Sequence, residues 1–275
     1  MNILSDIIAH KKKEVAERKA LYPAKLLEKS VYFSSPGVSL KKYLQRADKT
    51  GIIAEIKRKS PSLGVINNYV SVERTSIGYM QAGASALSIL TDTRFFGGQN
   101  EDLTTARKFN YCPILRKDFI IDEYQVIESK SIGADVILLL ANVLDAVQVK
   151  ELGRLAHSLG MEVLLELREA PELSALNEFV DVAGVNNRNL NDFSVDINQS
   201  LKMASLLPAG MLRVSESGLS SAATIHELKQ AGYSGFLIGE TFMKNSRPEL
   251  ACARLIKEVA EYEERAREPV AAARK

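Results

Sequence analysis

Short apolar runs that alternate with helical segments are the feature that most constrains the fold of this chain. Each run is almost wholly apolar, as expected of strands in a parallel sheet whose two faces are both covered. Several of the helical segments between the runs end on glycine, which commonly caps helices in the left-handed conformation. The runs number eight, at residues 52–56, 84–90, 113–115, 136–140, 163–167, 182–185, 211–214 and 235–238.

Eight strands alternating with helices predict a (β/α)8 TIM barrel, the simplest closure of such a sheet in the α/β class. A doubly wound open sheet is the alternative, but it would normally have fewer strands and a ligand-binding switch point. The sequence contains neither G-x-G-x-x-G nor G-x-x-x-x-G-K-[ST], so neither dinucleotide nor P-loop chemistry is indicated. A length of 275 residues suits a single barrel.

Charge and cysteine content argue against several classes of protein. The formal net charge is +2, from 36 basic and 34 acidic side chains, so nothing indicates nucleic-acid or membrane binding. Cys112 and Cys252 are the only cysteines and lack C-x-x-C spacing, which argues against a disulfide framework and a structural zinc site. The most apolar stretch, 136–144, is shorter than a membrane span and contains Asn142. We therefore expect an unprocessed, cytoplasmic protein.

The two ends of the chain differ from the barrel pattern. Residues 1–48 are expected to form a helical extension packed on a catalytic barrel at 49–262, and the extension opens with an amphipathic helix. We interpret Lys11, Lys12 and Lys13 as part of the solvated face of that helix, with a polyanion site as the alternative. Residues 263–275 are rich in Glu, Arg and Ala and are expected to fray, with Pro269 breaking any helix.

Polar and charged residues follow five of the predicted strands. In a barrel the carboxyl ends of the strands form one rim, and active sites lie there. Glu55 and Lys57 stand two residues apart and point to one side of the first strand; taken alone, they fit a structural ion pair as well as an active site. The rim residues are Glu55, Lys57, Arg116, Lys117, Asp118, Glu166, Asn186, Arg188 and Glu216.

Small and polar residues follow the last two predicted strands. Ser217 and Gly218 come after the seventh strand, and Gly239 and Glu240 come after the eighth. The corresponding loops of many barrels bind phosphate through backbone N–H groups and a helix N-terminus. Either glycine alone could merely permit a tight turn, but the two together favour a phosphate site.

Six stretches of residues, in order and in register, carry a family resemblance. They read A-E-I-K-R-K-S-P-S at 54–62, L-S-I-L-T-D at 87–92 with F-F-G-G at 95–98, P-I-L-R-K-D-F-I at 113–120, G-V-N-N-R-N-L at 184–190, V-S-E-S-G-L at 214–219 and F-L-I-G-E at 236–240. Together they closely resemble the indole-3-glycerol phosphate synthases of tryptophan biosynthesis. The resemblance extends from the opening helix to about Met243 and shows no fusion to a second enzyme of the pathway.

The resemblance implies a carboxy-lyase that acts by general acid and base catalysis, without a metal or organic cofactor. Its substrate would be 1-(2-carboxyphenylamino)-1-deoxyribulose 5-phosphate, which closes an indole ring with loss of carbon dioxide and water. By the same resemblance Lys117 is the general acid and Glu166 the general base. Lys57 would hold the substrate carboxylate, and Glu55 would orient these groups and stabilise positive charge on the substrate.

Further substrate contacts are implied by the matching positions of the family. Asn186 would contact a substrate hydroxyl, Arg188 would position the substrate, and Ser60 would lie in a loop that closes over it. Glu240 stands where some relatives have serine, so we expect only its backbone N–H to contact phosphate and its carboxylate to turn away. The remaining implied contacts are Glu216, an apolar slot for the anthranilate ring formed by Phe96, Phe119, Leu138 and Leu190, and a phosphate cup formed by Ser217, Gly218, Gly239 and Glu240.

Two other functions are compatible with part of this pattern. Another phosphate-binding barrel of the pathway, such as phosphoribosylanthranilate isomerase, would need a different acid and base and would not account for A-E-I-K-R-K-S-P together with L-R-K-D-F. A non-catalytic barrel that binds a phosphorylated ligand would be favoured if Lys117 or Glu166 were replaced, but both are present. The expected partner is a small phosphorylated molecule, and the expected state is a monomer, with a weak homo-oligomer as the alternative.

Overall fold

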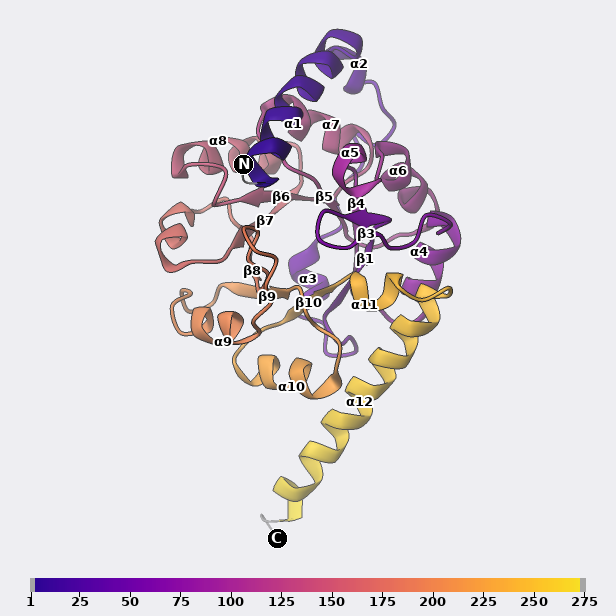
Figure 1. Ribbon diagram of the computed structural model, residues 1–275, viewed down its shortest axis with the longest axis vertical. Helices are drawn as coiled ribbons and strands as arrows, with labels where there is room; N and C mark the ends of the chain where they lie inside the picture. The colour runs from indigo at the N-terminus through magenta and orange to yellow at the C-terminus, as the bar shows by residue number, and fades with distance from the viewer. Residues whose placement is uncertain (1–2, 273–275) are drawn as a thin grey trace.

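Eight parallel strands form a closed barrel, as the sequence predicts (Figure 1). The computed structural model describes the backbone of residues 3–272 and the side chains of residues 3–266. Each predicted apolar run overlaps one strand of the barrel. The strands are β1 (Ile52–Ile56), β4 (Ala86–Leu90), β5 (Ile114–Lys117), β6 (Val136–Leu140), β7 (Glu162–Leu167), β8 (Val182–Asn186), β9 (Leu212–Glu216) and β10 (Gly235–Ile238). The ring closes because β1 pairs with β10 on one side and with β4 on the other.

Helices surround the ring on its outer face (Figure 1). Between β7 and β8 the connecting element is a 3-10 helix rather than an α-helix, and it begins beside Pro171. The covering elements are α4 (Val72–Gln81), α6 (Asn100–Phe109), α7 (Glu123–Ser131), α8 (Ala146–Ser158), η1 (Ala170–Ala175), α9 (Asn198–Ala204), α10 (Ala222–Gln230) and α12 (Pro248–Ala272).

Two apolar layers hold the barrel together. The outer layer lies between the strands and the helices, and Ile89, Ile137 and Phe236 belong to it. The inner layer fills the barrel with side chains such as Ile53 and Leu115. Strand residues alternate between the two layers, which explains why the runs are apolar at almost every position. Each fully buried aliphatic side chain contributes about 1.5–3 kcal/mol of transfer free energy.

The segment before the barrel forms three helices, α1 (Ile3–Leu21), α2 (Ala24–Leu27) and α3 (Leu40–Leu44). Leu40 and Leu44 of α3 belong to the inner apolar layer, so α3 covers the end of the barrel where the strands begin. Our interpretation of the lysine triplet is wrong for Lys11, whose side chain is fully buried while Lys12 and Lys13 are exposed. Lys11 lies four residues after the buried Ile7 and therefore shares its face of α1.

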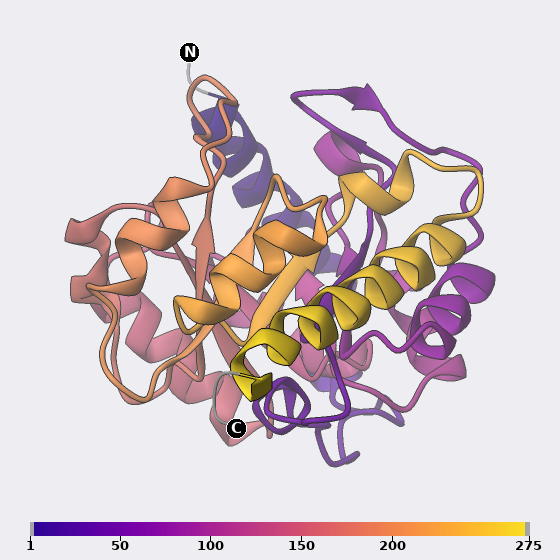
Figure 2. The ribbon, with the colours of Figure 1, turned by 90° about the horizontal axis from the view of Figure 1, so that it is seen from below.

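Several short elements lie at the rim where the strands end. They are the β2–β3 hairpin (Lys59–Ser60 and Gly64–Val65), α5 (Thr93–Phe96) and α11 (Glu240–Met243). Figure 2 shows the start of α1 and the β2–β3 hairpin on the same side of the barrel, and the last turns of α12 near the opposite side. The first helix and the loop after β1 thus lie at the same rim.

The chain ends in the long helix α12, which continues to Ala272 and therefore passes through Pro269. Our expectation that Pro269 breaks any helix there is wrong. A proline lacks one backbone N–H donor, but its fixed φ angle is itself helical, so a helix can continue through it at a cost. The expected fraying of residues 263–275 stays a prediction, and residues 273–275 lie outside the described part of the chain.

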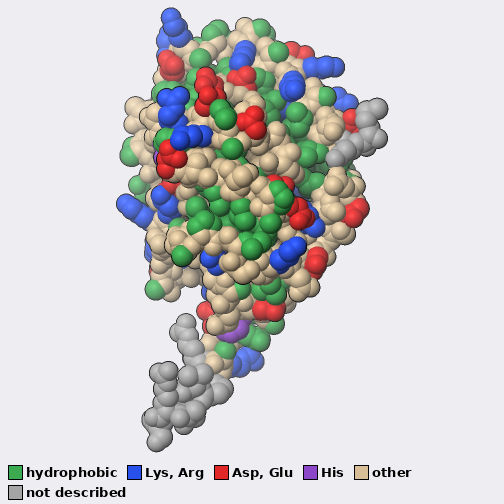
Figure 3. All heavy atoms as spheres, turned by 90° about the vertical axis from the view of Figure 1, so that its left-hand side faces the viewer, with side chains coloured by type: hydrophobic (Ala, Val, Ile, Leu, Met, Phe, Trp, Pro, Cys, Tyr) green, Lys and Arg blue, Asp and Glu red, His purple; other side chains and the backbone are tan. Residues whose placement is uncertain are grey.

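Charged side chains of both signs are intermixed over the face of the molecule shown in Figure 3. This distribution agrees with the small formal net charge of the chain. Within residues 3–272, no helix is long and apolar enough to cross a membrane.

Candidate active site

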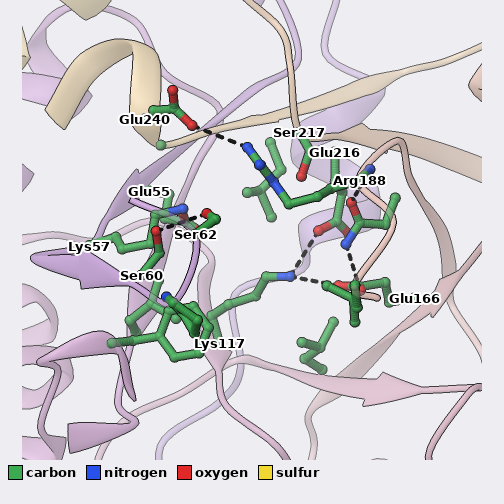
Figure 4. Close-up of a pocket in the computed structure, with 18 of the residues that line it drawn as sticks. Glu55, Lys57, Ser60, Ser62, Lys117, Glu166, Arg188, Glu216, Ser217 and Glu240 are labelled. Carbon is green, nitrogen blue, oxygen red and sulfur yellow. Dashed lines mark hydrogen bonds and ion pairs between the residues drawn. The ribbon is translucent and has the colours of Figure 1, made fainter. Parts of the chain in front are cut away.

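All the candidate site residues except Arg116 line one cavity at the rim where the strands end, whereas Arg116 is buried and donates hydrogen bonds to Gln125 and Glu128 of α7. Their proximity follows from the barrel, because parallel strands deliver residues that are far apart in sequence to the same edge. Figure 4 shows side chains from several strand ends pointing into this cavity. The candidates that line it are Glu55, Lys57, Ser60, Phe96, Lys117, Phe119, Leu138, Glu166, Asn186, Arg188, Leu190, Glu216, Ser217, Gly218, Gly239 and Glu240.

Lys117, the last residue of β5, is at the centre of the charged groups in the cavity. Its Nζ atom lies 2.8 Å from Glu166 Oε2 and 2.8 Å from Glu216 Oε2 (Figure 4). Asn186 Nδ2 donates a hydrogen bond of 2.8 Å to the other carboxylate oxygen of Glu166. The lysine is therefore held between two carboxylates, and one of those carboxylates is oriented by an amide.

The protonation states within this cluster are set by burial and mutual charge. Burial alone would lower the pKa of Lys117, but Glu166, Glu216 and Glu55 together raise it above its usual value. Burial alone would raise the pKa of Glu166, but Lys117 holds it below the usual range of a carboxyl. At neutral pH Lys117 is therefore protonated and Glu166 is ionised.

Glu216 differs from Glu166 although both contact the same lysine. Burial raises the pKa of Glu216 to about 7; Lys117 opposes this rise, while the charges of Glu166 and Glu55 add to it. Its Oε1 atom is buried and has no hydrogen-bond partner among the described residues. Two carboxyls of one site thus have pKa values displaced in opposite directions, an arrangement that suits acid and base chemistry.

Glu55 and Lys57 form an ion pair on the same rim. The Nζ atom of Lys57 lies 2.7 Å from Glu55 Oε1, and the Glu55 carboxylate is almost fully buried. The backbone at two glycines lies so close to the carboxylates of Glu55 and Glu216 that no side chain would fit there. A Cβ atom at Gly239 would lie 2.2 Å from Glu55 Oε1, and one at Gly184 would lie 2.4 Å from Glu216 Oε1.

An apolar wall faces the charged cluster. The rings of Phe96 and Phe119 contact each other with centroids 5.9 Å apart. Leu138 and Leu190 also line the cavity. Together they provide a surface against which a flat aromatic ring could stack.

The loops after β9 and β10 form the polar end of the cavity. Ser217 has a φ of 70°, an uncommon conformation for a residue with a side chain, and Gly218 follows with a φ of 76°. Two successive residues in this region turn the backbone sharply beside the cavity. Gly239 and Glu240, at the start of α11, line the same space.

The Glu240 carboxylate pairs with Arg188 across this polar end. Its Oε2 atom lies 3.2 Å from the guanidinium (Figure 4). The guanidinium also donates a hydrogen bond to the carbonyl of Phe193. The sequence predicts that the Glu240 carboxylate turns away from the phosphate cup, but it does not predict the contact with Arg188. Sequence gives no sign of the pair, because the two residues are 52 positions apart.

The loop after β1 lies over one side of the cavity. Ser60 and Ser62 contribute hydroxyl groups that lie 3.3 Å apart. The base of the loop is tied to the neighbouring β4 connection, because Arg58 forms a bidentate ion pair with Asp102. Lys59 donates a hydrogen bond to the carbonyl of Arg94.

Some residues that line the cavity were absent from the sequence-based candidates. Ile3, Leu4 and Ile7 of α1 contribute apolar surface, and Phe193 lies near the polar end. The apolar face of the first helix was visible in the sequence, but nothing in it indicated that this face reaches the rim. Within the described residues, no group of three His, Cys, Asp or Glu side chains is arranged to hold a metal ion.

Comparison with known proteins gives a consistent result. Residues 4–255 match the family model described as "Indole-3-glycerol phosphate synthase". A protein of that name from Bacteroides thetaiotaomicron is 47% identical over 247 residues, covering 90% of this chain and 95% of its own length. Another from Burkholderia vietnamiensis is 40% identical, covering 92% of this chain and 98% of its own length.

Comparison of structures shows the fold alone. The 3-hexulose-6-phosphate synthase of Salmonella typhimurium aligns with a TM-score of 0.60 at 14% sequence identity, covering 77% of this chain and 99% of its own. The thiamine phosphate pyrophosphorylase of Pyrococcus furiosus aligns with a TM-score of 0.58 at 16% identity, covering 81% of this chain and 98% of its own.

Proposed function

The chain belongs to the indole-3-glycerol phosphate synthase family, and we propose that Lys117 and Glu166 carry the two main proton transfers of its reaction. The enzyme is a lyase. It converts 1-(2-carboxyphenylamino)-1-deoxyribulose 5-phosphate to indole-3-glycerol phosphate in tryptophan biosynthesis. A carbon–carbon bond forms between the aromatic ring and the ketone carbon, and carbon dioxide and water are lost.

Lys117 acts first, as the general acid. When the ring carbon attacks the ketone carbon, the ketone oxygen gains negative charge and must take up a proton. Lys117 is protonated and lies within the cavity, so it can supply that proton as the bond forms. Loss of carbon dioxide from the attacking ring carbon then leaves a hydroxyl group on the former ketone carbon, which is now part of the new five-membered ring.

Glu166 acts in the second part, as the general base. The new five-membered ring becomes aromatic when its hydroxyl departs as water and one of its carbons loses a proton. Glu166 is ionised, and its carboxylate is held by Asn186, so it can accept that proton. Lys57 can protonate the departing hydroxyl, and Glu55 fixes Lys57 and balances positive charge on the substrate.

Binding groups surround these four residues. Lys57 holds the substrate carboxylate before it is lost. The anthranilate ring lies against Phe96, Phe119, Leu138 and Leu190. The polar groups of the substrate's ribulose part are contacted by Asn186, Arg188, Glu216 and Ser60. The phosphate binds the backbone N–H groups of Ser217, Gly218, Gly239 and Glu240, and these four residues line the cavity.

We further propose that the enzyme works in the cytoplasm as a monomer. Both cysteines are free thiols and buried, which suits a reducing compartment. One chain supplies every group that the mechanism uses. Size-exclusion chromatography with light scattering should give a mass near 30.3 kDa, and a stable dimer would contradict the monomer.

The observation that carries the mechanism is the position of the protonated Lys117 beside the ionised Glu166. The test is turnover of the anthranilate-bearing ribulose phosphate by purified protein, followed through the fluorescence of the indole product without added metal. We expect indole to appear. A soundly folded sample that gives no product would overturn the proposed mechanism.

A further inference from the structure

The side chain of Lys11 joins the first helix to two loops of the active-site rim. It is fully buried, although its neighbours Lys12 and Lys13 in sequence are exposed. Its Nζ atom lies 3.0 Å from Asp92 Oδ2, 2.9 Å from Asp118 Oδ1 and 3.1 Å from the carboxylate of Glu14. Lys11 donates hydrogen bonds to Glu14, and its contacts with Asp92 and Asp118 are ion pairs, so three carboxylates surround one buried ammonium group.

Asp92 and Asp118 each fix the backbone of a residue in the apolar wall. Asp92 caps α5, accepting hydrogen bonds from the N–H of Phe95 at 2.7 Å and of Phe96 at 3.3 Å. Asp118 accepts a hydrogen bond of 2.8 Å from the N–H of Phe119. One ammonium group therefore holds both of the carboxylates that orient Phe96 and Phe119.

The contact between Lys11 and Asp118 also affects the position of Lys117. Asp118 directly follows Lys117 at the end of β5, and its second oxygen accepts hydrogen bonds from Thr91 at 2.6 Å and Arg116 at 3.1 Å. Burial alone would raise the pKa of Asp118, but Lys11 and Arg116 lower it below its usual value. Asp118 is therefore a buried anion that depends on two cations.

Removing Lys11 would disturb this arrangement in a specific way. Asp92 would be left buried without a cation, and Asp118 would retain only Arg116. An unpaired buried carboxylate either takes up a proton or moves toward water. Either response would release the loops that carry Phe96 and Phe119 and would shift the backbone next to Lys117.

We propose that Lys11 is a positioning residue for the ring-closure reaction, which sets the aromatic slot and Lys117 in register through Asp92 and Asp118. The proposal rests on the proposed function, because it takes Phe96 and Phe119 as the wall that binds the substrate ring. Lys11 itself is not among the described residues that line the cavity.

The test compares Lys11→Met with Lys13→Met, which removes an exposed lysine of the same triplet. For Lys11→Met we expect kcat/KM to fall by roughly 100-fold, with a raised KM as well as a lowered kcat, because misplacement by about 1 Å has effects of this size. Lys13→Met should match the wild type. Binding of an unreactive, reduced substrate analogue, measured by calorimetry, should weaken in parallel with KM.

A merely structural role would give a different pattern. It would lower the folded fraction and hence the apparent kcat, but the folded molecules would keep the wild-type KM and analogue affinity. That result would overturn the proposal. If Lys11→Met does not fold, Lys11→Gln decides, since its amide can still donate to one aspartate; we expect a folded protein with a raised KM. A wild-type KM in Lys11→Gln, or failure of both variants to fold, would also overturn the proposal.

Failure of the proposed function would look different again. The wild type and Lys13→Met would then produce no indole, whatever the state of Lys11. A change confined to the Lys11 variants therefore tests the positioning role alone.

Discussion

Lys117 Nζ lies 2.8 Å from Glu166 Oε2, so the proposed acid and the proposed base form an ion pair. Each partner stabilises the charged form of the other, and these are the forms that catalysis needs at the start: a protonated lysine and an ionised carboxylate. A single ion pair thus keeps both groups in the protonation states that the reaction requires. Substrate must then separate them or bind alongside them.

Lys117→Ala should lower kcat by about 10²- to 10⁴-fold, the usual contribution of a general acid. The variant should fold, because Glu166 and Glu216 can share a proton once their cation is lost. Indole fluorescence gives the rate, and circular dichroism checks the fold. Lys202→Ala, at an exposed lysine of α9, is the matched control and should keep the wild-type rate. A near-full rate in Lys117→Ala would exclude it as the acid.

Glu166→Gln should also lower kcat by about 10²- to 10⁴-fold, because the amide cannot accept a proton. KM should change little, since the Gln oxygen can still accept the hydrogen bond from Asn186. Steady-state kinetics separate the two constants. Glu151→Gln, at an exposed position of α8, should have no effect. The assignment of the base fails if Glu166→Gln changes KM alone.

Lys57→Met should weaken binding of carboxylated ligands by about 10- to 100-fold, the range for a lost hydrogen bond to a charged group. The reason is that Lys57 is proposed to hold the substrate carboxylate. Calorimetry with two unreactive analogues, one with and one without that carboxylate, isolates the contact. Equal losses for both analogues would show that Lys57 acts in some other way.

Glu240→Ser should tighten phosphate binding by a few-fold, because half-exposed ion pairs contribute about 0.2–1 kcal/mol. Without Glu240, Arg188 loses its carboxylate partner and the polar end of the cavity loses one negative charge. Competitive inhibition by inorganic phosphate measures the effect. Glu258→Ser removes an exposed acid of α12 and serves as the control. An unchanged inhibition constant would mean that the charge of Glu240 does not weaken phosphate binding.

Glu216→Gln should change how stability depends on pH. The pKa of Glu216 is raised in the folded protein, so the native state binds more protons than the unfolded state between the ordinary carboxyl pKa and about pH 7. Glu216 therefore destabilises the fold progressively as the pH rises through that window, by roughly 3 kcal/mol at most. Urea unfolding at pH 4.5 and pH 8 should show this loss in the wild type relative to Glu216→Gln. A constant difference between the two proteins would contradict the raised pKa.

Most of the barrel could be predicted because each strand is a local pattern. A run such as 136–140 is apolar at every position, and its length and flanks mark it as a buried strand. The position of the site followed from the topology, since parallel strands bring Lys117 and Glu166 to one rim. The family resemblance then supplied roles that no pattern of spacing contains.

Contacts between distant segments were harder to predict. The burial of Lys11 was missed because the lysine triplet was interpreted as a unit, although the four-residue spacing of Ile7, Lys11 and Val15 indicates a shared face. The pair of Arg188 and Glu240 has no such local sign. Their contact depends on how two loops meet across the cavity, and that is decided by the packing of the whole barrel.

The lack of space around Gly184 and Gly239 limits which substitutions this active site can accept. Side chains are excluded there by the carboxylates of Glu216 and Glu55, so even alanine would push a proposed site residue out of place. A search for variants with new ring-closing substrates should therefore keep both glycines fixed. Diversity belongs instead in the apolar wall and at Glu240, where the cavity can change shape while its acids keep their positions.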